Sequence, residues 1–590
     1  MIAERGEIVI RTVVALTGCT ALAIAGLAHI TPGEAQSPSG DQSRTVQVWL
    51  TPDLAGAEQY ATAVSTPGSP DFHHYLSPNA YTARFGPSAA KAEAVSDWLR
   101  LRGMTDVRIS SGRDYISASG QASKMQPVPD ELAPDILSVT GLNNSAAARA
   151  ASVARPQPTC SSYWAQRAKT ISPPYRGFTK ASLPVCGYSA QQLRAAYGAS
   201  WAATGRGQTI ALTESEAPTN MAQTLREYAR RNHLPAPKPG QFREVHVGGT
   251  GSCSASTRSA QQYNDEAEMD SEAAYAMAPA ANQLMVVGSG CDEDQSLLNA
   301  VLAVLTGNGH RPSASIVSNS WQIPIGDASP KTWHAITLRA AVEGVGLYMS
   351  SGDTPGLTMT ASDPLVTAVG GTTLGLDARS NRVFETGWSN GQAMFEDSKW
   401  SDLGITGAGG GTSLLYAQPA YQKGVVPPSM SHVRLGGKTV ANRAVPDIAA
   451  VADLDTGMLT GYTTLDDKGR PTYQTMVNAG TSLSAPLVAG LIAGAQQGRR
   501  TPFGFINPLV YRLHGTRAIN DVLPINQAMP QQNRAAYTPA NGTDSATIDV
   551  FDAHNATDTD QTTVKGYDTT TGLGTPNGLP FILGLRYLAH

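Results

Sequence analysis

The sequence feature that most constrains the fold is a regular alternation of strand-like and helix-like segments through the middle of the chain. Short apolar runs such as 209–215 and 314–321 predict strands, and the stretches 221–233 and 266–278 between them predict helices. Apolar strands that alternate with helices indicate a parallel sheet covered on both faces. We therefore expect an α/β protein with a doubly wound, mostly parallel sheet.

Polar residues follow two of the predicted strands directly. They are Ser318–Trp321 and Ser350–Asp353. Because active sites of parallel sheets lie at the carboxyl ends of the strands, we expect these residues to border a functional site.

A different kind of unit precedes the alternation. Segment 44–50 predicts a strand, and 53–66 and 88–103 have the apolar spacing of helices. Alternating segments that predict paired strands follow. We interpret 44–143 as an α+β unit of ferredoxin-like type, 144–179 as a linker that contains a processing region, and 180–590 as the α/β domain. The linker begins with a stretch rich in Ala, Ser, Arg and Pro that is open to proteolysis (143–159).

The first 35 residues have the pattern of an export signal. Arg5 and Arg11 precede an apolar run at 12–28, which is short for a membrane span and has the length of a signal-peptide core. We interpret 1–35 as a signal peptide and expect a secreted protein without a membrane span after processing. Two alternatives stay open: a lipid anchor on Cys19 in "LTGC", and an uncleaved membrane anchor.

Removal of the signal leaves four of the five cysteines, and an even number in an exported chain predicts disulfides. Three pairings are possible; Cys160–Cys186 and Cys253–Cys291 close the shortest loops and are favoured. The chain has no Cys-x-x-Cys spacing or His/Cys cluster, which argues against a zinc site. The net charge of −4 gives no indication of a nucleic-acid partner.

The stretch "NAGTSLSAPLVAG" (478–490) places Ser482 at the entry of an apolar helix, with Pro486 expected in its first turn. Free N–H groups at a helix N-terminus suit a developing oxyanion, so Ser482 is a candidate nucleophile. The alternative is a serine that only caps the helix. A nucleophilic serine needs a base, and the chain has only 11 histidines.

The segments "DTG" (455–457) and "HGT" (514–516) invite comparison with subtilisin-like serine proteases, in which an Asp and a His precede the serine. Here His514 follows Ser482, and Asp455 lies too close before it to leave room for the intervening strands and helices. A histidine-based triad is therefore not expected.

Acidic residues offer another base. In "NDEAEMDSEAAYAMAP" (264–279), Glu266 and Asp270 are four residues apart and share one face of a helix. Such a pair can titrate as a coupled base and partner. Glu268 and Glu272 have the same spacing on another face, and periodicity does not choose between the pairs. A solvated acidic face is the alternative interpretation.

Together these segments resemble the sedolisin family of serine-carboxyl peptidases, in the kumamolisin-like form with an N-terminal activation pro-domain. "EAEMD" (266–270) resembles the family's Glu-x-x-x-Asp motif, and "SSGD" (350–353) resembles its oxyanion segment. "AGTSLSAP" (479–486) resembles the serine segment, except that Ala479 stands where the family usually has Gly. "HHYLSPNAYTARFGPS" (73–88) resembles the pro-domain hallmark. The resemblance implies a subtilisin-like fold for the catalytic domain.

The resemblance also implies roles. Ser482 attacks the scissile carbonyl and forms an acyl-enzyme, Glu266 acts as general base and then acid, and Asp270 orients Glu266. Protonated Asp353 donates to the oxyanion, and Glu214 and Trp321 extend the proton network. At pH 4 a histidine with a pKa of about 6.5 is neutral in roughly one molecule in 300, whereas a glutamate with a pKa near 4 is poised as a base. We therefore expect activity in acid that is lost toward neutral pH.

The C-terminal segments 520–522 and 564–578 resemble the family's calcium site. The resemblance implies one Ca²⁺ per chain, held by carboxylates and backbone carbonyls, and all-oxygen ligation suits that ion. Relatives often have Gly where this chain has Val564. The implied ligands are Asp521, Val522, Val564, Gly566 and Asp568.

From the sequence we thus expect an endopeptidase made as a zymogen. Its substrates are proteins or peptides, its own pro-domain is an intramolecular inhibitor, and it is a monomer. The non-enzymatic alternative is an inactive sedolisin-fold binding protein, but Ser482, Glu266, Asp270 and Asp353 are all present.

Overall fold

The computed structural model describes residues 43–590, apart from 126, 142–159, 219, 249–264, 290–291, 324–328, 466–467, 526–528, 540–544 and 554–560. The expected signal peptide, Cys19, the pair Cys253–Cys291 and the stretch 143–159 therefore lie outside the described residues. Among the helices that are described, none is long and apolar enough to cross a membrane.

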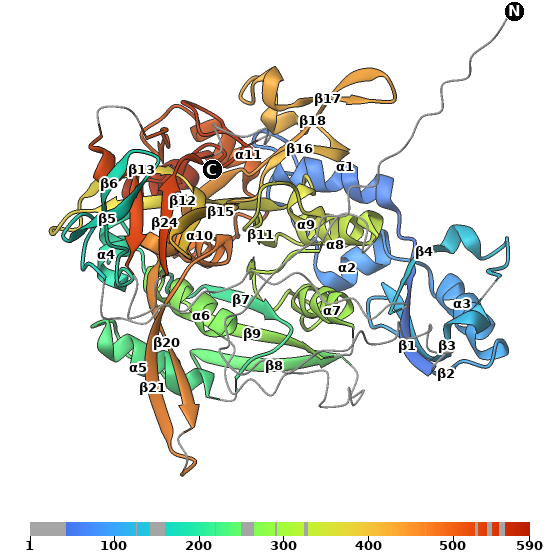
Figure 1. Cartoon of the computed structure of the whole chain (residues 1–590). Coiled ribbons are helices and arrows are strands. Elements are labelled where there is room, and N and C mark those ends of the chain that lie inside the picture. The colour runs from blue at the N-terminus through green and yellow to red at the C-terminus, as the bar shows by residue number, and fades with distance from the viewer. Residues whose placement is uncertain are drawn as a thin grey trace, which may run out of the picture. The chain divides into compact units, whose positions relative to one another are not determined.

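The N-terminal unit is a four-stranded antiparallel sheet in the order β2-β3-β1-β4, with α3 against β2 and β3 (Figure 1). Its core contains Val46 and Val48 of β1 packed with Val95 and Leu99 of α3. The two predicted helices form and begin at side-chain caps, because Asp53 accepts from the Gly56 amide and Ser88 from the Lys91 amide. The α+β prediction is confirmed. The elements are β1 Ser43–Leu50, α1 Leu54–Ser65, α2 Pro78–Arg84, α3 Ala89–Leu101, β2 Thr105–Ile109, β3 Tyr115–Gln121 and β4 Ile136–Thr140.

The main sheet has eight strands in the order β13-β12-β11-β10-β7-β9-β8, and β19 also pairs with β12. Every pair except β12–β13 is parallel, so the predicted mostly parallel sheet is confirmed. Figure 1 shows β7, β9 and β8 side by side in green. The strands are β7 Thr209–Glu214, β8 Phe242–Gly248, β9 Asn282–Ser289, β10 Ile316–Asn319, β11 Gly346–Ser350, β12 Thr367–Leu376, β13 Arg382–Gly387 and β19 Ile448–Val451.

Helices cover both faces of this sheet, as the apolar strands predict. Successive residues of β7 belong to different cores: Ile210 and Leu212 pack with α6 and α10, whereas Ala211 packs with α7 and α8. Ile316 and Val317 of β10 divide in the same way. The period of two along a strand thus sends side chains into two separate cores. The helices are α5 Met221–Arg231, α6 Asp265–Met277, α7 Glu293–Thr306, α8 Pro330–Val342, α10 Thr481–Gln496 and α12 Gly578–Leu588.

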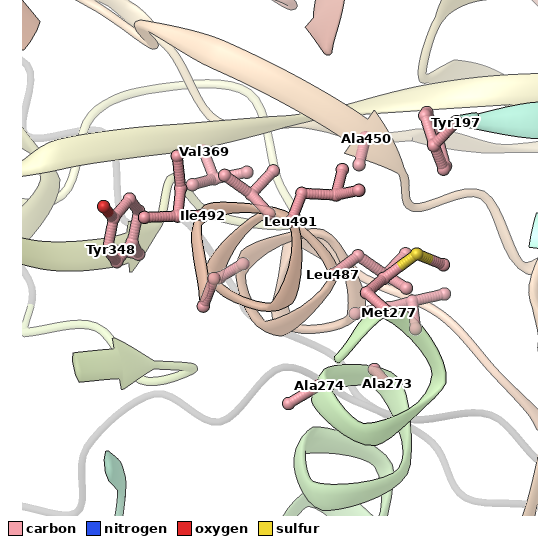
Figure 2. Close-up of a cluster of buried hydrophobic side chains, with 14 of the residues drawn as sticks. Tyr197, Ala273, Ala274, Met277, Tyr348, Val369, Ala450, Leu487, Leu491 and Ile492 are labelled. Carbon is pink, nitrogen blue, oxygen red and sulfur yellow. The ribbon is translucent and has the colours of Figure 1, made fainter. Parts of the chain in front are cut away.

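Helix α10 is buried along its whole length and packs closely on α6. A Cβ atom at Gly490 would lie 2.6 Å from Cβ of Met277 and 2.9 Å from the carbonyl oxygen of Ala274, so only glycine allows this approach. Figure 2 shows Ala273, Ala274 and Met277 of α6 beside Leu487 of α10. This packing fixes the carboxylate-bearing helix relative to the serine-bearing helix.

One local prediction about α10 is wrong. Pro486 was expected in the first turn, but α10 begins at Thr481, and Pro486 is the sixth residue, inside the helix. A proline there has no N–H to donate to the carbonyl four residues earlier, which is that of Ser482. The hydroxyl of Ser320 lies 3.1 Å from this carbonyl oxygen and can replace the missing donor.

The disulfide Cys160–Cys186 forms, as one of the favoured pairs. Within the expected linker, β5 (Ala168–Tyr175) pairs with β6 (Phe178–Ser182), and β6 pairs with β23, so this part of the expected linker belongs to a sheet of the main body. These strands belong to a six-stranded sheet, β15-β14-β24-β23-β6-β5. Its other members are β14 Ser389–Glu396, β15 Lys399–Gly407, β23 Ala535–Thr538 and β24 Ala546–Phe551; smaller sheets contain β16 Gly411–Ala417, β17 His432–Leu435, β18 Lys438–Val445, β20 Met458–Leu465, β21 Pro471–Asn478, β22 Ile519–Asn520 and β25 Thr575–Pro576.

The N-terminal unit docks on the main body through Tyr75. Its hydroxyl donates to the carbonyl of Phe503 at 2.8 Å. Gly344 and Gly504, both with positive φ, border its ring so closely that a Cβ at either position would lie 2.4 Å from a Tyr75 atom. The two glycines therefore form a slot that fits this side chain.

A buried ion pair adds to the docking surface. Nη1 of Arg339 on α8 lies 2.9 and 2.7 Å from the two carboxylate oxygens of Asp114, which belongs to the N-terminal unit. Nε of the same arginine donates to Glu343 at 2.8 Å. The docked N-terminal unit thus supplies one of the two carboxylate partners of a cation that is only 1% exposed.

His73, beside Tyr75, has a strained backbone conformation and a buried ring nitrogen. Its φ is +63°, a region that non-glycine residues rarely adopt. Its ring stacks on Phe72 at 3.7 Å, and among the described residues Nε2 is buried without a hydrogen-bond partner. Burial, and then the charge of Arg499, lower the pKa of His73 to about 4. The docked arrangement therefore favours neutral His73.

This arrangement predicts how docking depends on pH. The pKa of His73 is below the usual value of about 6.5, so its contribution is fully present above about pH 6.5 and is lost as pH falls toward 4. We expect His73→Gln to shift detachment of the N-terminal unit to lower pH, measured by limited proteolysis across a pH series. His74→Gln, at the exposed neighbour, is the control. The same pH dependence in both variants and the wild type would contradict the prediction.

Candidate active site

Ser482 is the second residue of α10 and is fully buried. Residues that follow two central strands bind the start of this helix: Ser320, after β10, contacts Ser482, and Asp353, after β11, contacts Thr481. The hydroxyl of Ser482 donates to the carbonyl oxygen of Ser320 at 3.3 Å. The predicted serine thus lies at the carboxyl ends of the parallel strands, where the two polar stretches were expected to border a site.

Asp353 is tied to the first residue of α10. Its Oδ1 accepts from the backbone amide of Thr481 at 2.8 Å, and the Thr481 hydroxyl lies 2.8 Å from the same oxygen. Burial raises the pKa of Asp353, and the bonds from Thr481 oppose that rise. A protonated Asp353 is a hydrogen-bond donor beside the nucleophile and the free N–H groups of the helix terminus.

Asp270 is fully buried on α6 and lies against the same helix terminus. Ser320 Oγ is 2.8 and 2.7 Å from its two oxygens. Burial first, then the charge of Glu214, raise the pKa of Asp270 well above its usual value; a hydrogen bond with Glu214 adds to the rise, and the bond from Ser320 opposes it. Two carboxyl groups this close retain a proton between them at acid and moderately acid pH.

The structure separates the two carboxylate pairs that the sequence left equivalent. Glu266 is one turn before Asp270 on the face that leads to Ser320, and it is partly exposed where Asp270 is buried. Glu268 and Glu272 face another way: Glu268 accepts from the amide of Thr463 at 3.3 Å, and Glu272 accepts from that of Gly461 at 2.7 Å. The second pair therefore supports β20 and lies away from the serine.

Some of the other residues considered from the sequence lie at the site and others do not. Glu214, at the end of β7, joins Asp270 as expected. Trp321 is buried next to Ser320, but its indole N–H donates to Thr213 at 2.9 Å. His514 follows the short helix Tyr511–Leu513 and is exposed, whereas Ser482 is buried. Asp455 is buried in a turn where its carbonyl accepts from the amide of Val185.

Sequence reasoning gave no role of their own to two residues of this site, Ser320 and Thr481, although both lie in segments that it singled out. Ser320 joins Asp270 to the Ser482 backbone, and Thr481 joins Asp353 to the start of α10. The spacing of Pro486 from Ser482 is a signal that could have revealed the need for an outside donor such as Ser320.

The expected calcium ligands gather around segment 564–566. Both oxygens of Asp521 accept from the amide of Gly566, at 3.0 and 3.1 Å, and Asp568 Oδ2 accepts from that of Val564 at 3.2 Å. Asp568 is fully buried, and burial raises its pKa to about 7 despite bonds from Thr570 and Thr571. A cation would compensate this buried carboxylate. The described residues hold no cluster of three or more His, Cys, Asp or Glu, so backbone carbonyls, such as that of Val522, would complete the ligand set.

The fold is a subtilisin-like α/β architecture, and a buried serine lies with buried carboxyl groups at the carboxyl ends of its parallel strands. A solved structure, Pseudomonas sedolisin (serine-carboxyl proteinase) complexed with two molecules of pseudo-iodotyrostatin, shares the fold with a TM-score of 0.51 at 21% identity, covering 68% of this chain and 99% of that one. Residues 33–128 match the family model for the pro-kumamolisin activation domain.

Two curated relatives extend the likeness in sequence. Kumamolisin from Bacillus sp. (strain MN-32) is 31% identical over 396 residues, which is 65% of this chain and 60% of kumamolisin. Sedolisin from Pseudomonas sp. (strain 101) is 25% identical over 532 residues, covering 81% of this chain and 82% of sedolisin. The match thus spans about three-fifths of the length of kumamolisin. Together these matches support a kumamolisin-like member of the sedolisin family, with a kumamolisin-type activation domain matched at residues 33–128.

The contact between Asp353 and the start of α10 predicts that Gly480 cannot be replaced. Its φ is +96°, and a Cβ would lie 2.7 Å from Asp353 Oδ2. We expect Gly480→Ala to lower the thermal unfolding midpoint more than Gly498→Ala. Both changes place a side chain on a residue with positive φ, which costs about 1–2 kcal/mol, but only Gly480→Ala also displaces Asp353. At Gly498 (φ +78°) a Cβ would meet nothing within 4 Å. Equal losses in calorimetry would contradict this role of Gly480.

Proposed function

We propose that the protein is a secreted, acid-active serine-carboxyl endopeptidase that is made as a zymogen. The observation that carries the proposal is the position of Ser482: a buried serine at a helix N-terminus, whose neighbour Thr481 binds Asp353 and whose backbone carbonyl is joined to Asp270 through Ser320. Membership in the sedolisin family supports the same reaction class.

In the proposed mechanism, Ser482 Oγ attacks the scissile carbonyl carbon while Glu266 takes its proton. Glu266 then gives this proton to the leaving amine, and the acyl-enzyme is hydrolysed by water that Glu266 deprotonates in turn. Asp270, one turn away on the same helix face, orients Glu266 and stabilises its charge. Asp353 donates a hydrogen bond to the oxyanion of each tetrahedral intermediate.

The pH range follows from the oxyanion donor. Asp353 donates only while it is protonated, and its raised pKa extends the protonated form beyond the usual range of an aspartate. Above that pKa the group becomes an anion that faces a developing anion. Activity is therefore present in acid and lost as pH rises.

The N-terminal unit is proposed to act as the intramolecular inhibitor until it is removed. The Tyr75 slot and the Arg339–Asp114 pair supply a specific docking surface, and acid weakens the docking through His73. The substrates are proposed to be proteins or peptides, in keeping with the relatives named as tripeptidyl-peptidases. The expected signal peptide supports export.

Activity measurements test the assignment of the base. We expect casein hydrolysis after acid incubation to be confined to acid across roughly pH 3 to 9, and to be abolished by Ser482→Ala and Glu266→Gln. Glu268→Gln, which changes the same residue type two positions away on the other face of α6, is the matched control and should remain active. Neutral activity that survives Glu266→Gln would show that the base lies elsewhere.

We also propose that Asp521, Asp568 and the carbonyls of Val522, Val564 and Gly566 hold one Ca²⁺. The ion would neutralise the buried Asp568 and join two distant segments of the chain, which is a structural role.

This proposal predicts a calcium-dependent stability. Addition of Ca²⁺ to chelator-treated protein should raise the thermal unfolding midpoint, and Mg²⁺ should not, because its smaller octahedral shell fits a cage of carbonyls poorly. Asp568→Ala should abolish the effect of Ca²⁺. An unfolding midpoint that is the same with chelator and with Ca²⁺ would contradict the site.

A further inference from the structure

The backbone carbonyl of Ser482 lacks its regular helical donor. In a regular helix, the carbonyl of Ser482 would accept from the amide of residue 486, but that residue is proline and has no N–H. The carbonyl is buried, and a buried acceptor without a donor costs free energy. The nucleophile therefore carries a backbone acceptor whose donor has to come from outside α10.

Ser320 supplies this donor. Its hydroxyl lies 3.1 Å from the carbonyl oxygen of Ser482. The same hydroxyl lies 2.8 and 2.7 Å from the two oxygens of Asp270. Three acceptor oxygens thus surround one hydroxyl oxygen, Ser320 Oγ, which carries a single hydrogen.

Counting protons gives two arrangements. If Asp270 is ionised, the Ser320 hydrogen goes to the carboxylate, and the Ser482 carbonyl faces an oxygen lone pair. If Asp270 is protonated, its O–H donates to Ser320 Oγ, and the Ser320 hydrogen is free to reach the Ser482 carbonyl. Only the second arrangement satisfies the Ser482 carbonyl, and in it Glu214 donates the hydrogen of its bond with Asp270.

We propose that Ser320 is a positioning residue that transmits the protonation of Asp270 to the backbone of the nucleophile Ser482. This inference rests on the proposed peptidase function. When Asp270 carries a proton, the Ser320 hydroxyl donates to the Ser482 carbonyl and fixes the first turn of α10. When Asp270 is ionised, this hydrogen bond is lost, and Ser482 is less well placed for attack.

The surroundings of Asp270 make it suitable for this role. Glu214 on β7 hydrogen-bonds with it, and Glu266 is the other carboxyl group on its face of α6. Strand β10 (Ile316–Asn319) and helix α10 (Thr481–Gln496) contain no charged residue. Carboxyl groups thus dominate its neighbourhood, and burial adds to the preference for the neutral form.

Kinetics with Ser320→Ala test the inference, and Ser318→Ala is the matched control. Ser318 is two residues away and fully buried, and its hydroxyl has no hydrogen-bond partner among the described residues. We expect Ser320→Ala to lower kcat by up to about 100-fold with little change in KM, and to make the neutral limb of the kcat profile shallower. The limb becomes shallower because ionisation of Asp270 no longer reaches Ser482 through Ser320, so that loss of the Asp353 proton alone lowers kcat. Ser318→Ala should change neither quantity.

An unchanged kcat in Ser320→Ala, or a lower kcat with a neutral limb as steep as that of the wild type, would overturn the inference. A double-mutant cycle gives an independent result, because Pro486→Ala restores the helix N–H that can donate to the Ser482 carbonyl. Ser320→Ala should therefore be less harmful in the Pro486→Ala background, both in kcat and in the thermal unfolding midpoint measured in acid.

The unfolding part of the cycle does not depend on activity. If the wild type fails to cleave any substrate in acid, the proposed function fails, whereas coupling between the two positions in the unfolding midpoint would still support the contact. Additive effects of the two substitutions on the unfolding midpoint would overturn the inference even in an active enzyme.

Discussion

The constraint on which the rest of the structure depends is the burial of carboxyl groups against the N-terminus of α10. Thr481 binds Asp353, and the backbone of Ser482 meets Asp270 through Ser320. Burial makes the neutral form of each acid the favoured one. Gly480 at the start of α10 and Gly490 in its middle allow this approach, because any side chain there would strike Asp353 or α6. The site is thus built for protonated acids.

Burial favours the neutral form in the docking surface of the pro-domain as well, but the titratable group there is a base and not an acid. At the site, burial raises the pKa of carboxyl groups, so acid supplies the protons that they favour. In the pro-domain, burial and Arg499 lower the pKa of His73 to about 4, so acid puts a charge where a neutral ring is favoured. The same fall in pH therefore protonates the acids of the candidate active site and weakens the docking of the pro-domain, which is proposed to inhibit that site.

The sequence predicts the layered fold well because apolar strands and helices alternate in it, and the period of two along β7 and β10 appears directly in the two cores. It does not choose between Glu266/Asp270 and Glu268/Glu272, because identical spacing gives identical helical phase and only β20 and Ser320 distinguish the faces. The position of Pro486 inside α10 was mispredicted because proline favours first turns, and here an outside hydroxyl replaces the lost donor. Ser320 and Thr481 act through contacts between distant segments, which a local pattern does not encode.

The central claim is that Asp353 is a neutral acid at the pH where the protein works. Infrared difference spectroscopy of the wild type and Asp353→Asn at acid pH measures this directly, because a protonated carboxyl group and a carboxylate absorb at different frequencies. The account predicts that the substitution removes a band of a protonated carboxyl, and that this band disappears as pH is raised, in parallel with activity. Loss of a carboxylate band instead, at a pH where the enzyme is active, would show that Asp353 is ionised and would contradict its role as the oxyanion donor.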